Sequence, residues 1–193
     1  MIYNSVNIEH FPEKIKHTRE QITLGCAGRL VTQKNQIVLI EMVKQLVAAG
    51  LNIKLLIAGK GELEEKLKQL ILASGMQEHI HLLGFSQDIN EFLEQIDIFA
   101  FPSLYEGSAN ILVEVMAKGL PCVTYNRSSM PEMIIHNETG LLANNDQEFC
   151  DALKALISSA DLRDKLGSQA RQFARKNFNS DDIYKQIENV IGQ

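Results

Sequence analysis

Two basic side chains that follow the first predicted strand could bind a diphosphate. Arg29 and Lys34 lie five positions apart in the segment GRLVTQK, between an apolar run and a helical pattern. Free backbone N–H groups at the start of a helix, together with a guanidinium and an ammonium group, suit a diphosphate. The alternative is that the arginine is solvated or ion-paired, as strand-end arginines often are.

Two acidic side chains follow a later predicted strand, in the segment PSLYEGSANILVE. Glu106 falls in the loop, and Glu114 falls about a turn and a half inside the next helical pattern. Gly107, Ser108 and Asn110 are small or capping residues that would leave N–H groups exposed at that helix start. A diphosphate would repel a carboxylate, so we expect both glutamates to face hydroxyl groups, as the acidic residue of dinucleotide folds faces a ribose. The alternative is a loop acid in water and a helix acid in a salt bridge.

The elements that must position these residues alternate regularly between short apolar runs and amphipathic patterns. The predicted strands are 22–27, 53–58, 79–83, 97–102, 121–125 and 140–143. The predicted helices are 35–49, 62–74, 88–95 and 109–118, followed by a helical tail from residue 146 whose last helix comes after Ser180. Such alternation with right-handed crossovers predicts a Rossmann-like α/β/α fold of three layers, with a parallel sheet of about six strands and extra C-terminal helices. Ligands of such folds bind at the carboxyl ends of the strands.

Length and composition exclude several other classes of protein. The 193 residues, 45% of them hydrophobic, suit one ordinary domain. A net charge of -5, 6% aromatic residues and no tryptophan argue against nucleic-acid binding. The three cysteines lack metal-ligand spacing and are expected to be buried and reduced. Because the start does not resemble a signal peptide and charges interrupt every apolar stretch, we predict a cytoplasmic protein.

Three further patterns have simpler explanations than a functional site. The segment Gly59-Lys60-Gly61 lacks the third glycine of a dinucleotide fingerprint and is interpreted as a turn before a helix. His79 and His81 share one strand face but have no apparent third metal ligand. The basic stretch 163–176 is interpreted as a solvated helix face, with contact to an anionic membrane as the alternative.

Taken together, the motifs resemble the donor-binding half of GT-B glycosyltransferases, and in particular the retaining glycosyltransferase family 4. The resemblance is carried by GRLVTQK and SLYEGSANILVEVMAKGLPCV in this order, with IHLLGFSQDINEFLEQIDIFAFPS between them and PEMIIHNETGLL after them. It implies binding of a nucleotide-diphospho-sugar, with a UDP-sugar favoured, for retaining transfer without a metal or other cofactor. No strand-end loop carries a metal-holding DxD motif.

The resemblance also implies a role for individual residues. Arg29 and Lys34 would stabilise the leaving nucleoside diphosphate, and with Glu106, which would bind donor-sugar hydroxyls, they form the catalytic set. Glu114 would hold the ribose, and Ser86 lies where the family's backbone contacts the base. The full donor-binding set is Gly28, Arg29, Lys34, Ser86, Glu106, Gly107, Ser108, Ala109, Asn110 and Glu114.

The chain departs from the family's pattern at two places near the expected sugar. Ser108 and Ala109 stand where many relatives carry an aromatic residue and a glycine, and Ser129-Met130 stands where Gly-Gly is common. The identity of the donor sugar therefore stays open.

The resemblance predicts a two-part chain that works with a partner domain. Residues 1–20 resemble an interdomain linker, and residues 21–193 the nucleotide-sugar-binding domain with its C-terminal helices. The acceptor would bind an N-terminal domain of the same enzyme, so Met1 is expected to begin a fragment that is inactive alone. Two alternatives are a standalone nucleotide-sugar-binding or regulatory module without catalysis, and another Rossmann-like enzyme such as a sugar-nucleotide epimerase or dehydrogenase.

Overall fold

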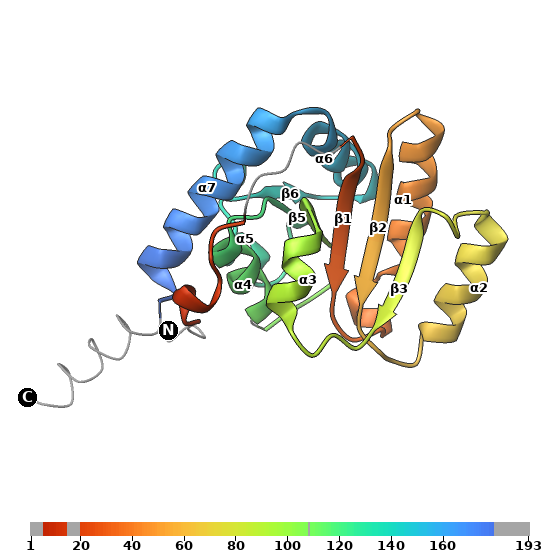
Figure 1. Cartoon of the computed structure of the whole chain (residues 1–193), viewed down its shortest axis with the longest axis horizontal. Helices are drawn as coiled ribbons and strands as arrows, with labels where there is room; N and C mark the ends of the chain where they lie inside the picture. Colours follow the sequence, from red (N-terminus) through yellow and green to blue (C-terminus); the bar gives the residue numbers. More distant parts are fainter. Residues whose placement is uncertain (1–5, 15–19, 108, 180–193) are drawn as a thin grey trace, which may run out of the picture.

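The structure, a computed structural model, describes residues 6–14, 20–107 and 109–179, which form a parallel sheet with helices on both faces (Figure 1). Within these residues the strands are β1 (Ile22–Ala27), β2 (Ile53–Ala58), β3 (Ile80–Gly84), β4 (Ile98–Phe101), β5 (Cys122–Tyr125) and β6 (Leu141–Ala143). Their order is β3-β2-β1-β4-β5-β6, and every neighbouring pair is parallel. The predicted Rossmann-like α/β/α fold is confirmed.

The central strands are buried along their whole length because helices cover both faces of the sheet. Every residue of β1 (ITLGCA), β4 (IFAF) and β5 (CVTY) is buried. The edge strand β3 differs, since buried Ile80 is followed by exposed His81 and exposed Leu83. This is the pattern expected of an edge strand with one face open to solvent.

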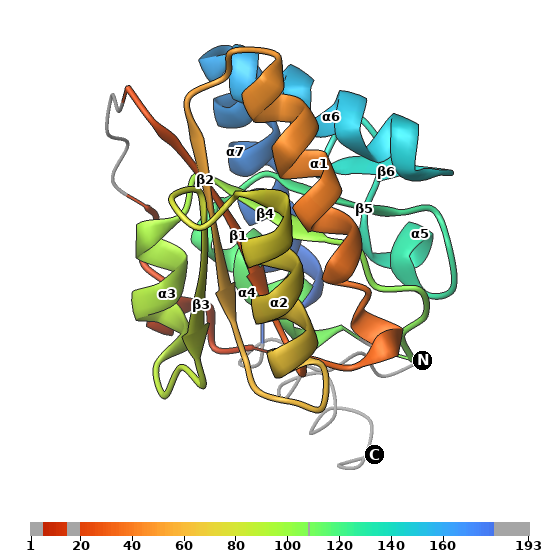
Figure 2. The same ribbon diagram turned by 90° about the vertical axis from the view of Figure 1, so that its right-hand side faces the viewer.

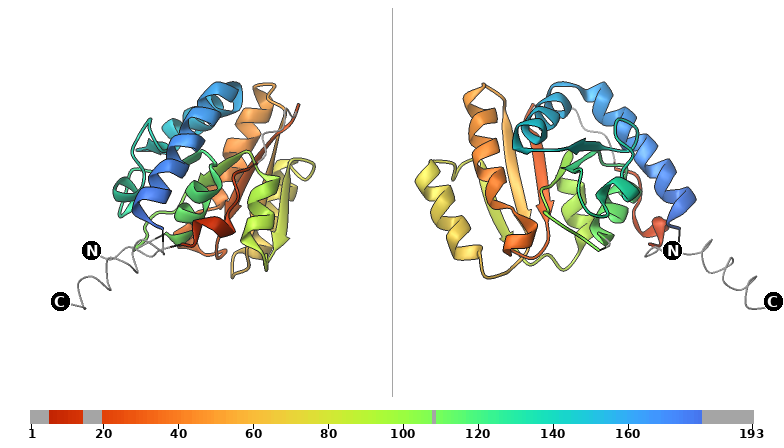
Figure 3. Two further views of the ribbon diagram at one scale, coloured as in Figure 1. Left: turned by 60° about the vertical axis from the view of Figure 1, so that its left-hand side comes forward. Right: turned by 180° about the vertical axis from the view of Figure 1, so that it is seen from behind.

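The helices divide into two groups, one on each face of the sheet (Figure 2). The first apolar core lies under α1 (Ile37–Ala48), α2 (Glu64–Ser74) and α6 (Asp146–Ser158). The second lies under α3 (Ile89–Gln95) and α4 (Asn110–Lys118). The two views of Figure 3 show α7 (Ala160–Asn177) running down one side of the molecule to the N-terminal segment 6–14.

The helix α7 (Ala160–Asn177) contributes apolar side chains to both cores, with Leu166 in the first and Ala170 in the second. Three shorter elements complete the described chain: η1 (Ile8–His10), η2 (Thr32–Lys34) and α5 (Met130–Met133). The sequence had indicated none of the three, since each lies in a segment without regular apolar periodicity.

The predicted elements match the observed ones with small differences at their ends. The helix expected from residue 35 begins at Ile37, because Asn35 has a left-handed backbone (φ 53°) after the short helix η2. Asp88 caps α3, since its side chain accepts hydrogen bonds from the N–H groups of Asn90 and Glu91. The predicted helix after Ser180 lies outside the described residues.

The N-terminal segment 6–14 packs against α4 and α7. Ile8 and Phe11 are buried in the second core, and the Val6 N–H donates to the carbonyl of Phe178 at 2.9 Å. The Arg171 guanidinium on α7 donates to the carbonyl of Phe11 at 2.7 Å and also to that of Ala117 on α4. The assignment of residues 1–20 as an interdomain linker stays a prediction.

The three cysteines are free and buried, as predicted. Burial raises the pKa of the Cys26 and Cys122 thiols to about 12, so both stay protonated and unreactive at neutral pH. In the described part of the chain, no helix combines the length and the apolar character needed to cross a membrane.

The packing of α7 on α4 depends on the absence of a side chain at Gly167. A Cβ atom at this position would lie 2.1 Å from the carbonyl oxygen of Gly119, just past the end of α4. We predict that Gly167→Ala lowers the free energy of unfolding by about 1–3 kcal/mol through overpacking. This loss exceeds the gain in helix propensity, which is at most about 1 kcal/mol.

Urea denaturation measures the change, and Ser168→Ala on the exposed side of α7 is the matched control. The control is expected to shift stability by no more than about 0.5 kcal/mol. A Gly167→Ala variant as stable as the original chain would contradict the close contact.

Candidate functional site

The described residues form a cleft of about 480 Å³ at the carboxyl ends of the strands, beside β1 and β2. Both basic and both acidic residues singled out in the sequence line it. Its walls are made by Ala27, Gly28, Arg29, Lys34, Ala58, Gly59, Lys60, Phe85, Ser86, Ile89, Glu106, Ala109, Asn110, Ile111 and Glu114.

The order of the strands places the cleft. β1 and β4 are neighbours in the sheet, although they are far apart in the chain. The chain leaves β1 toward α1 on one face and leaves β4 toward α4 on the other. The two loops therefore diverge at the switch point of the sheet, where doubly wound folds bind their ligands.

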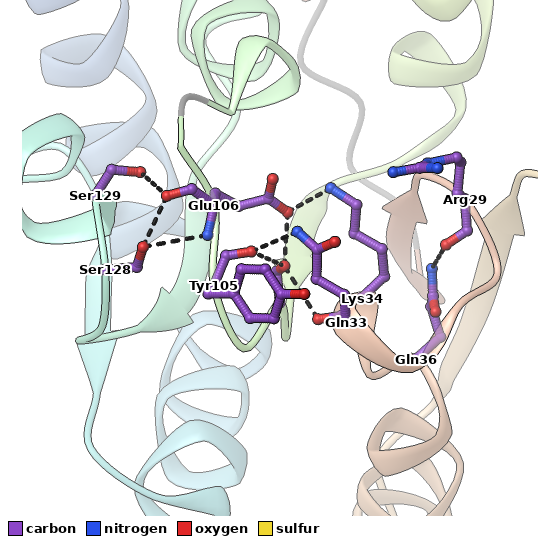
Figure 4. Close-up of polar contacts among 9 residues, drawn as sticks. Arg29, Gln33, Lys34, Gln36, Tyr105, Glu106, Ser128 and Ser129 are labelled. Atoms are coloured by element: carbon purple, nitrogen blue, oxygen red, sulfur yellow. Dashed lines mark hydrogen bonds and ion pairs between the residues drawn. The ribbon is translucent and has the colours of Figure 1, made fainter.

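An ion pair between Lys34 and Glu106 joins the two loops across the cleft (Figure 4). The side chains are largely buried, with 15% of Lys34 and 9% of Glu106 exposed. The Ser103 hydroxyl donates to the same oxygen of Glu106, Oε1, at 2.6 Å. The ammonium group also lies 5.3 Å from the centre of the Phe101 ring, within range of a cation–π contact.

Backbone contacts hold the same two loops together beside the ion pair. The Leu104 N–H donates to the Gln33 carbonyl at 2.9 Å, and the Gln33 side-chain amide donates to the Tyr105 carbonyl at 2.7 Å. The loops that carry Lys34 and Glu106 are thus fixed relative to each other even before any ligand binds.

Arg29 presents its guanidinium to the cleft from a loop that is anchored underneath. Its carbonyl accepts a hydrogen bond of 2.9 Å from the amide of Gln36, which is buried beneath the loop (Figure 4). The Arg29 side chain itself is exposed. The charge is therefore accessible to a ligand while its backbone is held in place.

The loop after β2 adds a third cation, Lys60, which the sequence analysis missed. Gly59 allows the close approach, because a Cβ atom there would lie 1.9 Å from the carbonyl oxygen of Gly28. The Leu30 N–H also donates to the Lys60 carbonyl at 3.0 Å, so the loops after β1 and β2 run side by side. The segment Gly59-Lys60-Gly61 forms the predicted turn before α2. Because ligands of such folds bind at the carboxyl ends of the strands, its position directly after β2 indicates that it also reaches the cleft.

Glu114 lies on the first turns of α4, at the cleft wall. Burial raises the pKa of its carboxyl group above the ordinary value for glutamate. The charged form is therefore disfavoured by the protein and gains from a ligand that donates hydrogen bonds to it.

Most of the predicted donor-binding residues meet at this cleft. Those that line it are Gly28, Arg29, Lys34, Ser86, Glu106, Ala109, Asn110 and Glu114. Gly107 is exposed and is not among the lining residues, and Ser108 lies outside the described residues. The Ser86 hydroxyl donates to the carbonyl of Asp88 at 2.8 Å, so its proton is already engaged in a hydrogen bond within the loop.

The patterns set aside in the sequence do not add a second site. The described residues contain no cluster of three or more histidine, cysteine, aspartate or glutamate side chains that could hold a metal ion. His79 lies with its Nδ1 atom 3.0 Å from the carbonyl oxygen of Ile53. The interpretation of 163–176 as a solvated face is wrong for Arg171, which is buried and bonded to carbonyls of Phe11 and Ala117.

Comparison with known proteins assigns the chain to a family. A family model described as glycosyl transferases group 1 matches residues 7–173, a range that includes the whole cleft. The chain belongs to the glycosyl transferases group 1 family. This membership favours a glycosyltransferase over the epimerase or dehydrogenase alternative.

Two of the curated relatives are named as biosynthesis glycosyltransferases, one for amylovoran and one for a capsular polysaccharide. The amylovoran biosynthesis glycosyltransferase AmsK of Erwinia amylovora is 31% identical over 195 residues, covering 95% of this chain and 48% of its own. The capsular polysaccharide biosynthesis glycosyltransferase CapM of Staphylococcus aureus is 26% identical over 178 residues, covering 91% and 47%. The chain therefore spans about half the length of the curated relatives it matches.

Solved structures show the same fold. Anabaena Alr3699/HepE in complex with UDP and glucose superposes with a TM-score of 0.88 at 22% identity, covering all of this chain and 56% of that one. The C-terminal domain of the glycosyl transferase group 1 family protein LpcC from Francisella tularensis gives 0.79 at 21%, covering 91% of this chain and 100% of that domain. The chain thus has the Rossmann-like fold of a GT-B C-terminal domain.

The raised pKa of Glu114 predicts a pH-dependent cost in stability. Because the folded state binds this proton more tightly than the unfolded state, stability falls as the pH rises through the pKa range, and the cost is complete at neutral pH. We predict that Glu114→Gln raises the free energy of unfolding at pH 7.5, and that the gain vanishes below about pH 4, where the carboxyl is protonated in both states.

Urea denaturation at the two pH values measures the difference. Glu62→Gln, in the exposed turn before α2, is the matched control and is expected to stay within about 0.5 kcal/mol at both. A Glu114→Gln variant that is less stable than the original chain at pH 7.5 would show that the carboxylate is stabilised where it lies.

Proposed function

We propose that the chain is the donor-binding domain of a retaining glycosyltransferase of family 4, and that its cleft binds a nucleotide-diphospho-sugar, with a UDP-sugar as the first candidate. The observation that carries the proposal is the meeting of Arg29, Lys34, Glu106 and Glu114 in one cleft of a glycosyl transferases group 1 chain. The complex of HepE with UDP and glucose supports the choice of nucleotide, since that protein shares this fold.

The cations of the cleft suit the diphosphate. Arg29 and Lys60 project from adjacent loops, and Lys34 lies deeper, beside Glu106. In our proposal, a bound diphosphate takes its main contacts from Arg29 and Lys34, and Lys60 adds charge at the rim. Charge-assisted hydrogen bonds of this kind are the strongest that side chains make with phosphate.

The two carboxylates suit the hydroxyl groups at either end of the same ligand. Glu106 uses Oε1 for Lys34 and Ser103, and neither contact uses Oε2, which we assign to hydroxyls of the donor sugar. Glu114 is assigned to the ribose hydroxyls, which would stabilise the charged form that burial disfavours. Ser86 and Phe85 lie at the part of the cleft that we assign to the base.

The proposed chemistry places fixed positive charge where negative charge develops. In transfer, the bond between the anomeric carbon of the sugar and the diphosphate oxygen breaks, and its electron pair leaves with the nucleoside diphosphate. A bond forms from the hydroxyl oxygen of the acceptor to the anomeric carbon, and the proton of that hydroxyl is released. Arg29 and Lys34 would stabilise that charge directly. No metal or other cofactor is required in this proposal.

The rest of the proposed enzyme lies N-terminal to this domain. We propose that residues 21–193 form the donor domain, that residues 1–20 lead to it from a domain that binds the acceptor, and that the enzyme works in the cytoplasm. The half-length match to the curated relatives supports this division.

The phosphate assignment predicts a graded loss of nucleotide affinity. Arg29→Ala and Lys34→Ala are each expected to weaken UDP binding at least about tenfold, because a charge-assisted hydrogen bond contributes roughly 1.5–3 kcal/mol. Lys60→Ala, at the exposed rim, is expected to lose less. Isothermal titration calorimetry with UDP measures the affinities.

Lys66→Ala is the matched control, because Lys66 is an exposed lysine of α2 away from the cleft. Its affinity is expected to equal that of the original chain. If Arg29→Ala and Lys34→Ala both bind UDP as well as the control does, at a temperature where circular dichroism shows all three variants folded, the phosphate assignment is wrong.

The division into two domains predicts binding without transfer. The 193-residue chain should bind a UDP-sugar but form no glycoside with any acceptor, because the acceptor is not held against the donor. An assay for released UDP, run with and without polysaccharide acceptors, measures this. Transfer by these residues alone would contradict the need for a second domain, while UDP binding combined with inactivity of the complete gene product would favour the regulatory alternative.

A further inference from the structure

Two serines of the loop between β5 and α5 form hydrogen bonds with the backbone of Glu106 on the side opposite Lys34 (Figure 4). The Ser128 hydroxyl donates to the carbonyl of Glu106 at 2.7 Å, and the Ser129 hydroxyl donates to the same oxygen at 2.9 Å. The Glu106 N–H in turn donates a hydrogen bond to the Ser128 Oγ at 3.3 Å. One residue is thus held through both of its backbone polar groups.

The backbone conformation of Ser128 is unusual, and it allows the Ser128 hydroxyl to reach Glu106. Its φ is 53°, in the left-handed region that residues other than glycine and asparagine seldom adopt. Serine at this position carries that cost while glycine would not. The hydroxyl, which glycine lacks, is the part of the residue that contacts Glu106.

Fixing the carbonyl of Glu106 fixes the peptide plane that follows it. In a trans peptide the N–H points opposite to the C=O, so the N–H of Gly107 is directed away from the two serines. The side chain of Glu106 is held separately, by Lys34 and Ser103. Together these contacts leave the carboxylate little freedom to turn, which is what a preorganised binding group needs.

We infer that Ser128 and Ser129 are positioning residues for Glu106: their hydroxyls set the place of its carboxylate, and through it the affinity for the sugar part of the donor. This inference rests on the proposed function and extends it to residues outside the cleft wall. Neither serine lines the cleft, so their effect on the sugar would be transmitted through Glu106 alone.

The test compares a nucleotide with and without its sugar. UDP, UDP-glucose and UDP-N-acetylglucosamine are titrated into the chain and into the double variant Ser128→Gly and Ser129→Ala. The variant removes both hydroxyls while glycine keeps the left-handed backbone. We expect UDP affinity to stay within about twofold, and affinity for the better-bound UDP-sugar to fall about three- to tenfold.

Ser129→Thr in the Ser128→Gly background is the matched rescue, since it restores one hydroxyl at the Glu106 carbonyl. It should recover part of the lost sugar affinity. Equal loss for UDP and the UDP-sugars, or loss of neither, overturns the positioning role. A variant with a lowered melting temperature is compared at a temperature where circular dichroism shows it folded.

Amide hydrogen exchange of residues 104–110 separates this inference from the proposed function. If the original chain binds none of the three nucleotides, the proposed function is wrong, but hydrogen exchange still tests whether the two serines hold the backbone of Glu106. Faster exchange of this segment in the double variant, with exchange in the rest of the chain unchanged, supports this role of the serines. Unchanged exchange shows that the hydroxyls do not hold Glu106.

Discussion

The site depends on one buried ion pair, between Lys34 and Glu106, that joins two loops 72 residues apart in the chain. Burying two charges is costly unless each finds its partner and further hydrogen bonds, and here Ser103 and the Phe101 ring supply additional contacts. The pairing is available only because β1 and β4 are neighbours in the sheet. Strand order thus decides which charges meet, and the meeting of these charges defines the cleft.

Two features that cost stability lie near this cleft. The carboxyl of Glu114 has a raised pKa, and Ser128 adopts a left-handed backbone conformation. In contrast, every residue of β1, β4 and β5 beneath the cleft is buried, and most of these residues are apolar. Strain and unfavourable charge gather at functional sites when the surrounding fold is stable enough to hold them, and this domain follows that rule.

Sequence reasoning predicted the architecture because apolar runs and amphipathic helices depend on local periodicity, which the chain shows clearly from residue 22 onward. It also placed Arg29 and Glu114 at the cleft, since strand ends of a parallel sheet share one edge. It did not predict that Lys34 and Glu106 pair with each other, because no local pattern records a contact between distant loops. Lys60 was missed for a related reason, since a turn already explained its flanking glycines.

Arg171 joins the N-terminal segment to α4, the helix that carries Glu114. Its guanidinium joins the carbonyl of Phe11 to that of Ala117, near the C-terminal end of the helix whose first turns carry Glu114. A displacement of segment 6–14 must either break these hydrogen bonds or carry the end of α4 with it. The N-terminal segment and the helix that carries Glu114 are therefore bonded to the same buried side chain.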